Sequence, residues 1–436
     1  MTHRVSRRTA VQTILGGTAA LAAGRARARA DEPAPTTETP PVTGQANPDL
    51  ASFDEMMLAF LKTNQVPGAA LAVTKDSKLI YARGFGYADV ESKRPVQPDS
   101  LFRIASISKP ITAVAVLQQV EQGKFKLDDR VFDVLPAGDW LPEKHDERLR
   151  TITIRQLLQH TGGWDRNKSF DPIGRVPAIA EFLKKSPPVG PADVIRYTLT
   201  LPLDFDPGTK YAYYNVSYLL LGRLIELATG QPYESVIKQK VLEPVGVSRM
   251  QLGRVWIDEL ARDEVHYYDS KRREGLAVNG PHLGTKVPLV YGAENLQAYE
   301  AHGGWIASAI DLVRFAADFD RPEASKLLRA ETIKTMWAVP EGPAGHDAAG
   351  KPNSLYYGCG WQVRARDGDQ RINTFHSGLI TGTSTILVRR YDGLNWAVLF
   401  NTDSNQHGKT LSGLVDSLVH EAADAVRRWP EQTLTI

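Results

Sequence analysis

Ser106 and Lys109 are the two residues whose types and spacing most directly suggest chemistry. A serine hydroxyl is a weak nucleophile until a neighbouring group takes its proton. Residues three apart project from the same side of a helix, so the Lys109 amine would lie close enough to do this. The same spacing recurs at Ser235 and Lys238 inside an amphipathic segment, so other motifs must decide whether Ser106 is a nucleophile.

A helix that begins near Ser106 is the element that would position this pair. Apolar residues recur at steps of three or four and predict one buried helical face: Ile107, Ile111, Val114, Leu117 and Val120. Pro110 falls within the first turn, where a missing N–H leaves no intrahelical bond unmade. Gly123 favours a helix end. Ser106 is therefore predicted to lie beside the unpaired amides of a helix N-terminus.

Two later segments supply the remaining polar groups. Residues 207–215 read PGTKYAYYN, and residues 375–378 read FHSG. With Ser106 and Lys109, they resemble the three ordered motifs of the serine β-lactamase and penicillin-binding protein superfamily, in its class C and D,D-peptidase-like branch. The resemblance covers about residues 50–425. Residues 157–163, LLQHTGG, also look like that branch's Leu-Leu-x-His-Thr-Ser-Gly segment.

The resemblance implies a role for each matching residue of the first two motifs. Ser106 would be the nucleophile, Lys109 a neighbouring amine, and Tyr213 the phenol hydrogen-bonded between them. Asn215 would orient the substrate amide and the lysine. Free Lys and Tyr have pKa values of ~10.4 and ~10, so either needs a lowered pKa to act as a base near neutrality. Burial lowers the pKa of a lysine and a nearby cation lowers the pKa of a tyrosine, so both Lys109 and Tyr213 are candidate bases.

The third motif departs from the β-lactamase pattern. Where those enzymes have Lys-Thr-Gly, this chain has His376-Ser377-Gly378, so an imidazole of pKa ~6.5 replaces a permanent cation. These three residues would bind substrate, with Gly378 leaving room for it along the strand edge. The resemblance also implies that the backbone N–H groups of Ser106 and Leu379 form the oxyanion hole. We expect weaker binding of a substrate carboxylate and less efficient turnover of a β-lactam.

Composition excludes several other classes of function. The formal charge is +2 over 436 residues, but the first thirty residues hold six arginines and no acids. The remainder carries 46 basic and 50 acidic side chains, a charge of about −4, so nucleic acid is not an expected partner. The ten histidines form no His-x-x-x-His pair, so neither a metal nor another cofactor is predicted. The single cysteine, Cys359, is expected to be a buried thiol in a strand.

The N-terminal residues indicate export. Paired arginines at 7 and 8 precede an uncharged run that is too short to span a bilayer, and small residues at 28 and 30 suit cleavage after Ala30. We predict a signal over 1–30, of the twin-arginine kind, and a periplasmic or extracellular product with no membrane span. A cytoplasmic protein is the alternative. Residues 31–48 are rich in Pro, Thr and Glu and predict a disordered spacer.

The rest of the chain, 49–430, is predicted to be one α/β (α+β) domain. A helix is expected over 51–61, strands over 68–73 and 79–83 form a hairpin, and 128–135 is read as an irregular connection. Strands return over 356–400 with Asp392-Gly393 as a hairpin turn. Residues 151–250 are mostly helical, and 411–426 form a closing helix. This predicts an antiparallel sheet built from both chain ends and flanked by helices, with an inserted helical lobe. The resemblance implies a β-lactamase/transpeptidase-like fold.

Two hypotheses for function follow. The first is an exported serine hydrolase that forms an acyl-enzyme on Ser106 from an ester, an amide or a D-amino-acid peptide. A β-lactam is possible as a poorer substrate. The second is a penicillin-binding sensor that is acylated but hardly deacylates. Under either hypothesis, the molecule that the protein binds would be a small molecule or a peptide.

Overall fold

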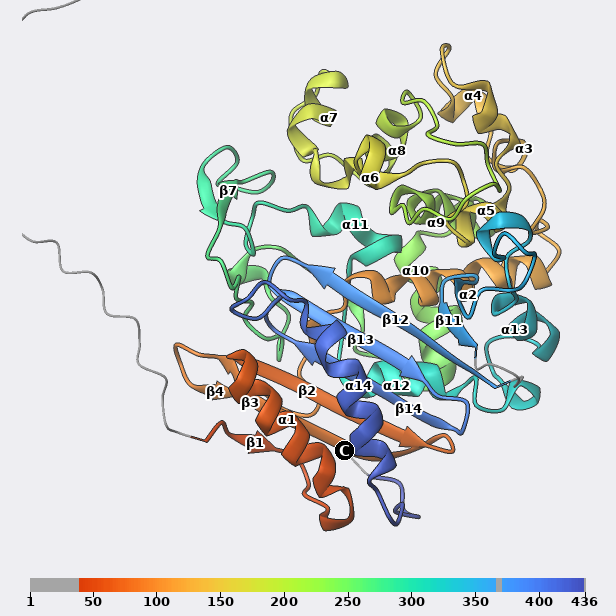
Figure 1. Cartoon of the computed structure of the whole chain (residues 1–436). Coiled ribbons are helices and arrows are strands. Elements are labelled where there is room, and N and C mark those ends of the chain that lie inside the picture. The colour runs from red at the N-terminus through yellow and green to blue at the C-terminus, as the bar shows by residue number, and fades with distance from the viewer. Residues whose placement is uncertain (1–38, 366–370, 435–436) are drawn as a thin grey trace, which may run out of the picture. The chain divides into compact units, whose positions relative to one another are not determined.

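A nine-stranded antiparallel sheet organises the computed structural model, which describes residues 39–365 and 371–434 (Figure 1). Its order is β1-β3-β2-β14-β13-β12-β11-β10, with β4 paired to β3. The strands are β1 Val42–Thr43, β2 Gly68–Lys75, β3 Lys78–Asp89, β4 Arg94–Pro95, β10 Leu355–Tyr357, β11 Gln362–Ala365, β12 Ile372–Ile380, β13 Thr383–Arg389 and β14 Leu394–Phe400. The sheet joins early strands to late ones, which confirms the predicted architecture.

The helices and smaller sheets occupy the intervening chain. The helices are α1 Ala51–Asn64, α2 Ser108–Glu121, α3 Val131–Val134, α4 Ala137–Trp140, α5 Ile154–Leu158, α6 Arg166–Ser169, α7 Val176–Phe182, α8 Pro191–Thr198, α9 Val216–Thr229, α10 Tyr233–Ile237, α11 Leu296–Gly303, α12 Ala309–Ala317, α13 Ala330–Met336 and α14 Leu411–Asp424. The smaller sheets contain β5 Phe102–Arg103, β9 Trp305–Ala307 and β6 Gln251–Leu252, and the hairpin β7 Glu274–Leu276 with β8 Lys286–Pro288. As predicted, 151–250 is mostly helical. Its separation as a lobe stays a prediction.

Tight turns set the antiparallel pairing. The loop between β2 and β3 contains only Asp76 and Ser77, and both have positive φ, 51° and 64°. Two-residue loops of this kind match the twist of the paired strands. Gly393, with φ of 80°, lies in the predicted turn between β13 and β14, and those strands pair as a hairpin.

Both faces of the sheet are buried, and β2 shows how one strand serves both. Ala70 and Ala72 belong to the core on the side of α2 and α12, whereas Leu71 and Val73 belong to the core under α1 and α14. This alternation follows from the two-residue period of a strand. Figure 1 shows α1 and α14 lying across one face of the sheet.

Helix α2 is buried differently from the prediction. The sequence predicts one apolar face, but Ser108 to Leu117 are all buried, polar residues included. The helix packs against α9 and α11 as well as against α10 and α13, so it has no solvent face over most of its length. A helix enclosed in this way holds its side chains in fixed positions.

Three local predictions are wrong. Within the predicted spacer, Val42–Thr43 forms strand β1, because it pairs with the edge of β3 and the Thr43 hydroxyl donates to the Val96 carbonyl at 2.5 Å. Cys359 is buried as expected but lies in the turn between β10 and β11, not in a strand. Residues 128–135 contain the short helix α3. The predicted signal at 1–30 and the spacer up to residue 38 lie outside the described residues.

Across the described ranges, no helix is both long enough and apolar enough to cross a bilayer. These described residues belong almost entirely to one compact unit that begins at Pro40.

Candidate active site

Ser106 lies at the junction of a strand and the buried helix. The 3₁₀ turn Ala105–Ile107 links β5 to α2, so the serine precedes the helix by two residues. Ala105 has a φ of 47°, in the left-handed region that alanine rarely adopts. The Ser108 hydroxyl donates to the Ala105 carbonyl at 2.7 Å and helps to hold this turn. Such strain is retained where the surroundings fix the backbone, and here it aims the Ser106 side chain.

Lys109 is fully buried, and its amine has three partners. The Nζ atom lies 3.0 Å from Ser106 Oγ, 2.8 Å from Asn215 Oδ1 and 2.8 Å from the His302 carbonyl oxygen. The last two atoms can only accept hydrogen bonds. A neutral amine has two N–H groups for them, which directs its lone pair to Ser106. Burial lowers the pKa of Lys109 well below its ordinary value, against the opposing effect of Asp171.

Tyr213 approaches the same hydroxyl from a different element. Its Oη donates to Ser106 Oγ at 2.8 Å, from the loop that precedes α9. The Lys109 amine and the exposed Arg166 guanidinium each lie 4.8 Å from the centre of the Tyr213 ring. Burial nevertheless raises the pKa of Tyr213 above its usual value, since desolvation outweighs the opposing effects of the Ser106 hydrogen bond and of Arg166. The phenol is therefore protonated near neutral pH.

Asp171 is a site residue that the sequence analysis missed. Its Oδ2 accepts hydrogen bonds from the Asn215 backbone N–H at 3.0 Å and from Asn215 Nδ2 at 2.9 Å. A carboxylate only accepts, so this bond fixes the amide with its oxygen toward Lys109. The only local signal was Asp171 before a proline, which is typical of a helix cap, and Asp171 does cap a 3₁₀ turn. Its link to Asn215 spans 44 residues, so spacing could not reveal it.

His376 faces inward, in contact with a second tyrosine. It is 1% exposed, its Nδ1 lies 2.8 Å from the Ser377 carbonyl oxygen, and its Nε2 lies 2.8 Å from Tyr357 Oη. A carbonyl only accepts, so Nδ1 carries the proton and Nε2 accepts from the tyrosine. Burial and the Lys109 amine lower the pKa of His376 to about 3, so this position carries no charge at neutral pH.

Gly378 lies at a crowded contact between β12 and the turn that holds the serine. A Cβ atom on Gly378 would lie 2.1 Å from the Ile104 carbonyl oxygen and 2.3 Å from Thr385 Oγ1. The close approach that requires glycine here is between β12 and the backbone that leads into Ser106; room for a substrate along the strand edge stays a prediction. This contact sets the distance between the strand and the serine.

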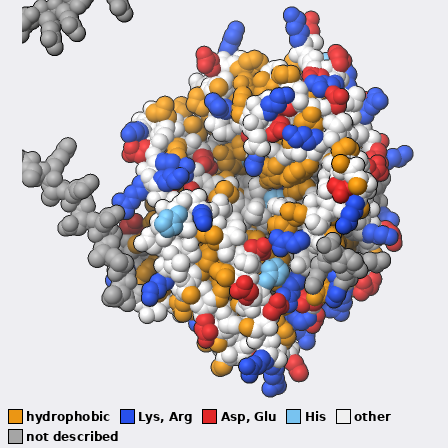
Figure 2. All heavy atoms as spheres, in the orientation of Figure 1, with side chains coloured by type: hydrophobic (Ala, Val, Ile, Leu, Met, Phe, Trp, Pro, Cys, Tyr) orange, Lys and Arg blue, Asp and Glu red, His pale blue; other side chains and the backbone are white. Residues whose placement is uncertain are grey.

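The neighbouring part of β12 is an open edge. β11 pairs with β12 only over Ile372–Phe375, so among the described strands none covers the same edge over residues 376–380. Leu379, whose N–H was predicted for an oxyanion hole, has a side chain that is 52% exposed. A cavity of about 510 Å³ opens beside it. Figure 2 shows a hollow with hydrophobic side chains on the face drawn, between the helices above and the sheet below.

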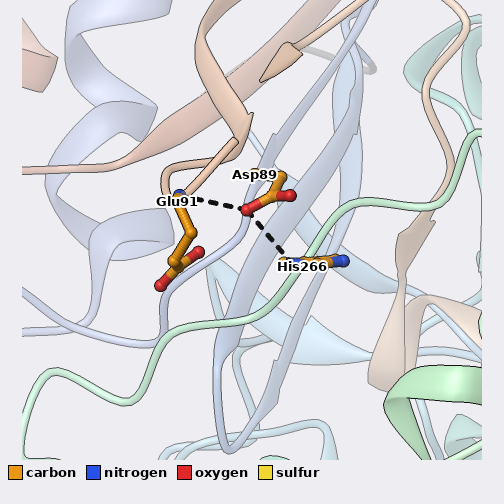
Figure 3. A group of neighbouring side chains, drawn as sticks. All are labelled: Asp89, Glu91 and His266. Atoms are coloured by element: carbon orange, nitrogen blue, oxygen red, sulfur yellow. Dashed lines mark hydrogen bonds and ion pairs between the residues drawn. The ribbon is translucent and has the colours of Figure 1, made fainter. Parts of the chain in front are cut away.

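A separate polar cluster lies at the end of β3 (Figure 3). Ligand atoms of Asp89, Glu91 and His266 lie within 4.8 Å of one another. Each has a partner within the protein: Asp89 accepts from the Glu91 N–H at 3.1 Å and lies 3.4 Å from His266 Nδ1, and Glu91 accepts from Tyr268 Oη at 2.9 Å. These bonds join the turn after β3 to residues 266–268, and this explains why the three side chains lie close together.

The site thus brings together residues from all three sequence motifs. Ser106, Lys109, Tyr213 and Asn215 are linked by direct hydrogen bonds, and β12 lies against the turn that holds the serine. The β-lactamase family model matches residues 53–419. This chain belongs to the β-lactamase family.

Individual relatives cover the chain to different extents. Esterase EstB of Burkholderia gladioli is 32% identical over 210 residues, which are 45% of this chain and 50% of that protein. This chain spans about half the length, or less, of the first curated relatives that it matches. The solved structure of EstCE1, a hydrolase with promiscuous acyltransferase activity, has a TM-score of 0.66 at 21% identity over 86% of this chain and 98% of that one. A D-stereospecific amidohydrolase from Streptomyces sp. has a TM-score of 0.62 at 23% identity, over 87% and 100%. The two structures show a shared fold.

Gly378→Ala tests the contact between β12 and the serine turn. Because the added Cβ would meet backbone at 2.1 Å, we expect a loss of about 1–3 kcal/mol in the free energy of unfolding, measured with urea. Gly138→Ala in α4, where a Cβ meets no atom within 4 Å, is the control and should not destabilise. Equal stability of the two variants would contradict the assignment.

Proposed function

We propose that the protein is an exported serine hydrolase that forms an acyl-enzyme on Ser106. One observation carries the proposal: the Ser106 hydroxyl is contacted by both the Lys109 amine, at 3.0 Å, and the Tyr213 phenol, at 2.8 Å. A nucleophile bonded to a base that a further group orients is the arrangement that covalent catalysis requires. Membership of a family that includes an esterase supports the reaction class.

In the proposed reaction, Ser106 Oγ attacks the carbonyl carbon of the substrate while its proton passes to Lys109. The N–H groups of Ser106 and Leu379 bind the developing oxyanion. The bond from the carbonyl carbon to the leaving oxygen or nitrogen then breaks, and the leaving group takes a proton through Tyr213 or Lys109. Water then attacks the acyl carbon of the acyl-enzyme and gives a proton to Lys109. The bond between that carbon and Ser106 Oγ breaks, Oγ takes the proton from Lys109, and the acid is released.

Lys109 is the base that the geometry favours. Asn215 Oδ1 and the His302 carbonyl oxygen take up the two N–H groups of a neutral amine, which leaves the lone pair for the serine proton. The lowered pKa of Lys109 and the raised pKa of Tyr213 both favour Lys109 over Tyr213 as the base. Asp171 supports this arrangement because it fixes the orientation of Asn215.

The neutral His376 narrows the substrate class. An uncharged, buried imidazole cannot supply the permanent cation that a substrate carboxylate would need at this strand. Simple esters and amides therefore fit the site better than a β-lactam does. Ser377, partly exposed on the same strand, would contact the substrate.

Ser106→Ala should abolish hydrolysis of 4-nitrophenyl butyrate, with kcat falling at least ~10³-fold. The matched control is Ser235→Ala, which removes the other serine that precedes a lysine by three residues and should leave the rate unchanged. Intact mass spectrometry should show an acyl adduct on the parent enzyme and none on Ser106→Ala. Undiminished turnover by Ser106→Ala would refute the mechanism. An adduct that never turns over would instead identify an acylated sensor.

The pH dependence should reveal which group is the base. Since the neutral amine of Lys109 is the active form and burial lowers its pKa, kcat/KM should rise with pH and level off well below pH 10. Lys109→Met should lose at least the ~10²–10⁴-fold that general-base catalysis supplies. Tyr213→Phe should lose less and keep the rising limb. If Tyr213→Phe removes that limb, the phenol is the base.

Export is predicted to follow from residues 1–30. The protein recovered from the periplasm or medium of a bacterial host should have an intact mass that begins at Asp31. Replacing Arg7 and Arg8 together with lysine should retain the precursor inside the cell, because the twin-arginine route depends on the pair. Equal export of the double variant would contradict that route.

A further inference from the structure

A cavity lies beside Leu379, the residue whose N–H is the proposed second donor of the oxyanion hole. Its volume is about 510 Å³, and its walls include Asp171, Arg273, Glu294, Tyr299, Leu379 and Thr381. On one side, Asp171 is connected through Asn215 to the Lys109 amine. On the other side is Leu379, the proposed oxyanion donor. An acyl group attached to Ser106 would therefore have this cavity next to it.

Glu294 presents a carboxylate to this cavity. Its Oε1 accepts a hydrogen bond from Thr381 Oγ1 at 2.6 Å, and it forms no ion pair with any residue that the structure describes. Burial raises its pKa above the ordinary value. A carboxylate largely withdrawn from water is stabilised by a bound cation that takes the place of its lost hydration.

The nearest guanidinium groups are engaged elsewhere. Arg273 pairs with Asp269 at 2.9 Å and with Asp403 at 3.1 Å. Arg103 donates to the carbonyl oxygens of Val290 and Arg254 at 2.9 and 3.0 Å. Neither neutralises Glu294 by direct contact, so the carboxylate can accept a cation from a ligand.

We propose that Glu294 binds the ammonium group of the substrate's acyl part, so that the preferred acyl donors are esters or amides of amino acids. The proposal rests on the proposed function, because it places the acyl carbonyl at Ser106. Thr381 follows Leu379 by two residues, in the turn after β12, so the two are at most ~7 Å apart along the chain. A carboxylate bonded to Thr381 is thus within reach of an amino group one or a few bonds from that carbonyl. The interaction would be a charge-assisted hydrogen bond.

Lys271, whose charge is opposite to that of Glu294, provides a control variant. It is an exposed cation in the wall of the same cavity, and no ion pair is formed by it among the described residues. Its charge repels an ammonium group, so its removal should not weaken binding of a cationic substrate. A cavity that recognised a substrate carboxylate would respond in the opposite way.

The experiment compares four ethyl esters at pH 7, those of D-alanine, L-alanine, β-alanine and propionic acid. The first three differ from the last by one amino group, which is mostly protonated at this pH. Each kcat/KM is divided by the rate of spontaneous hydrolysis of the same ester. We expect at least one amino ester to exceed the propionate ester by ~10-fold or more. Glu294→Gln should remove that preference, measured as the ratio of the amino-ester kcat/KM to the propionate kcat/KM, and Lys271→Met should keep it.

The outcomes separate the two proposals. If the propionate ester is hydrolysed in a Ser106-dependent way but no amino ester is preferred by the parent enzyme, the Glu294 proposal is overturned and the hydrolase stands. If Glu294→Gln keeps the preference, or Lys271→Met abolishes it, Glu294 is not the recognition group. If no ester acylates Ser106, the proposed function itself fails. Should Glu294→Gln not fold, the selectivity of the parent enzyme still decides whether an amino group is recognised.

Discussion

The buried amine of Lys109 is the point on which the rest of the site depends. An ammonium or amine without water must have its hydrogen bonds supplied by the protein. Here they come from three elements: the turn before α2, the loop before α9 and the end of α11. Each element is fixed by its own packing, and any shift would leave a buried polar group unpaired. The lysine therefore ties the positions of Ser106, Asn215 and the His302 carbonyl to one another.

This requirement explains why α2 is enclosed rather than amphipathic. A helix with one solvent face would let water reach the lysine and restore its ordinary pKa. Because α9 and α11 pack against α2, polar residues near its start are bonded internally: Thr112 donates to the Ala301 carbonyl at 2.6 Å, and Ser108 to the Ala105 carbonyl at 2.7 Å. The same enclosure raises the pKa of Tyr213. Packing around one helix thus sets the protonation of both candidate bases.

The sequence predicted the parts of the fold and site that depend on local patterns. Alternating strands, the Asp392-Gly393 turn and the three motifs each extend over a few residues, and resemblance put the motifs in one site. It could not predict partners that only the folded chain brings close, such as Asp171 to Asn215 or Glu294 to Thr381. Nor could it predict the crowded contact between Gly378 and the Ile104 backbone, which has no local signature. For α2, a regular apolar spacing concealed the fact that tertiary contacts bury its polar face too.

The distribution of charge follows from these contacts. At the third motif, His376 accepts from Tyr357 and donates to its own strand, so the position where related enzymes carry a cation is neutral here. In the turn that follows the same strand, Thr381 contacts a carboxylate that forms no ion pair among the described residues. The strand that would hold the substrate therefore has a neutral group at His376 and a negative group, Glu294, beside the turn that follows it. A substrate whose charge is reversed to match, with an amino group on its acyl side and no carboxylate near His376, is the one whose burial leaves the fewest unpaired charges.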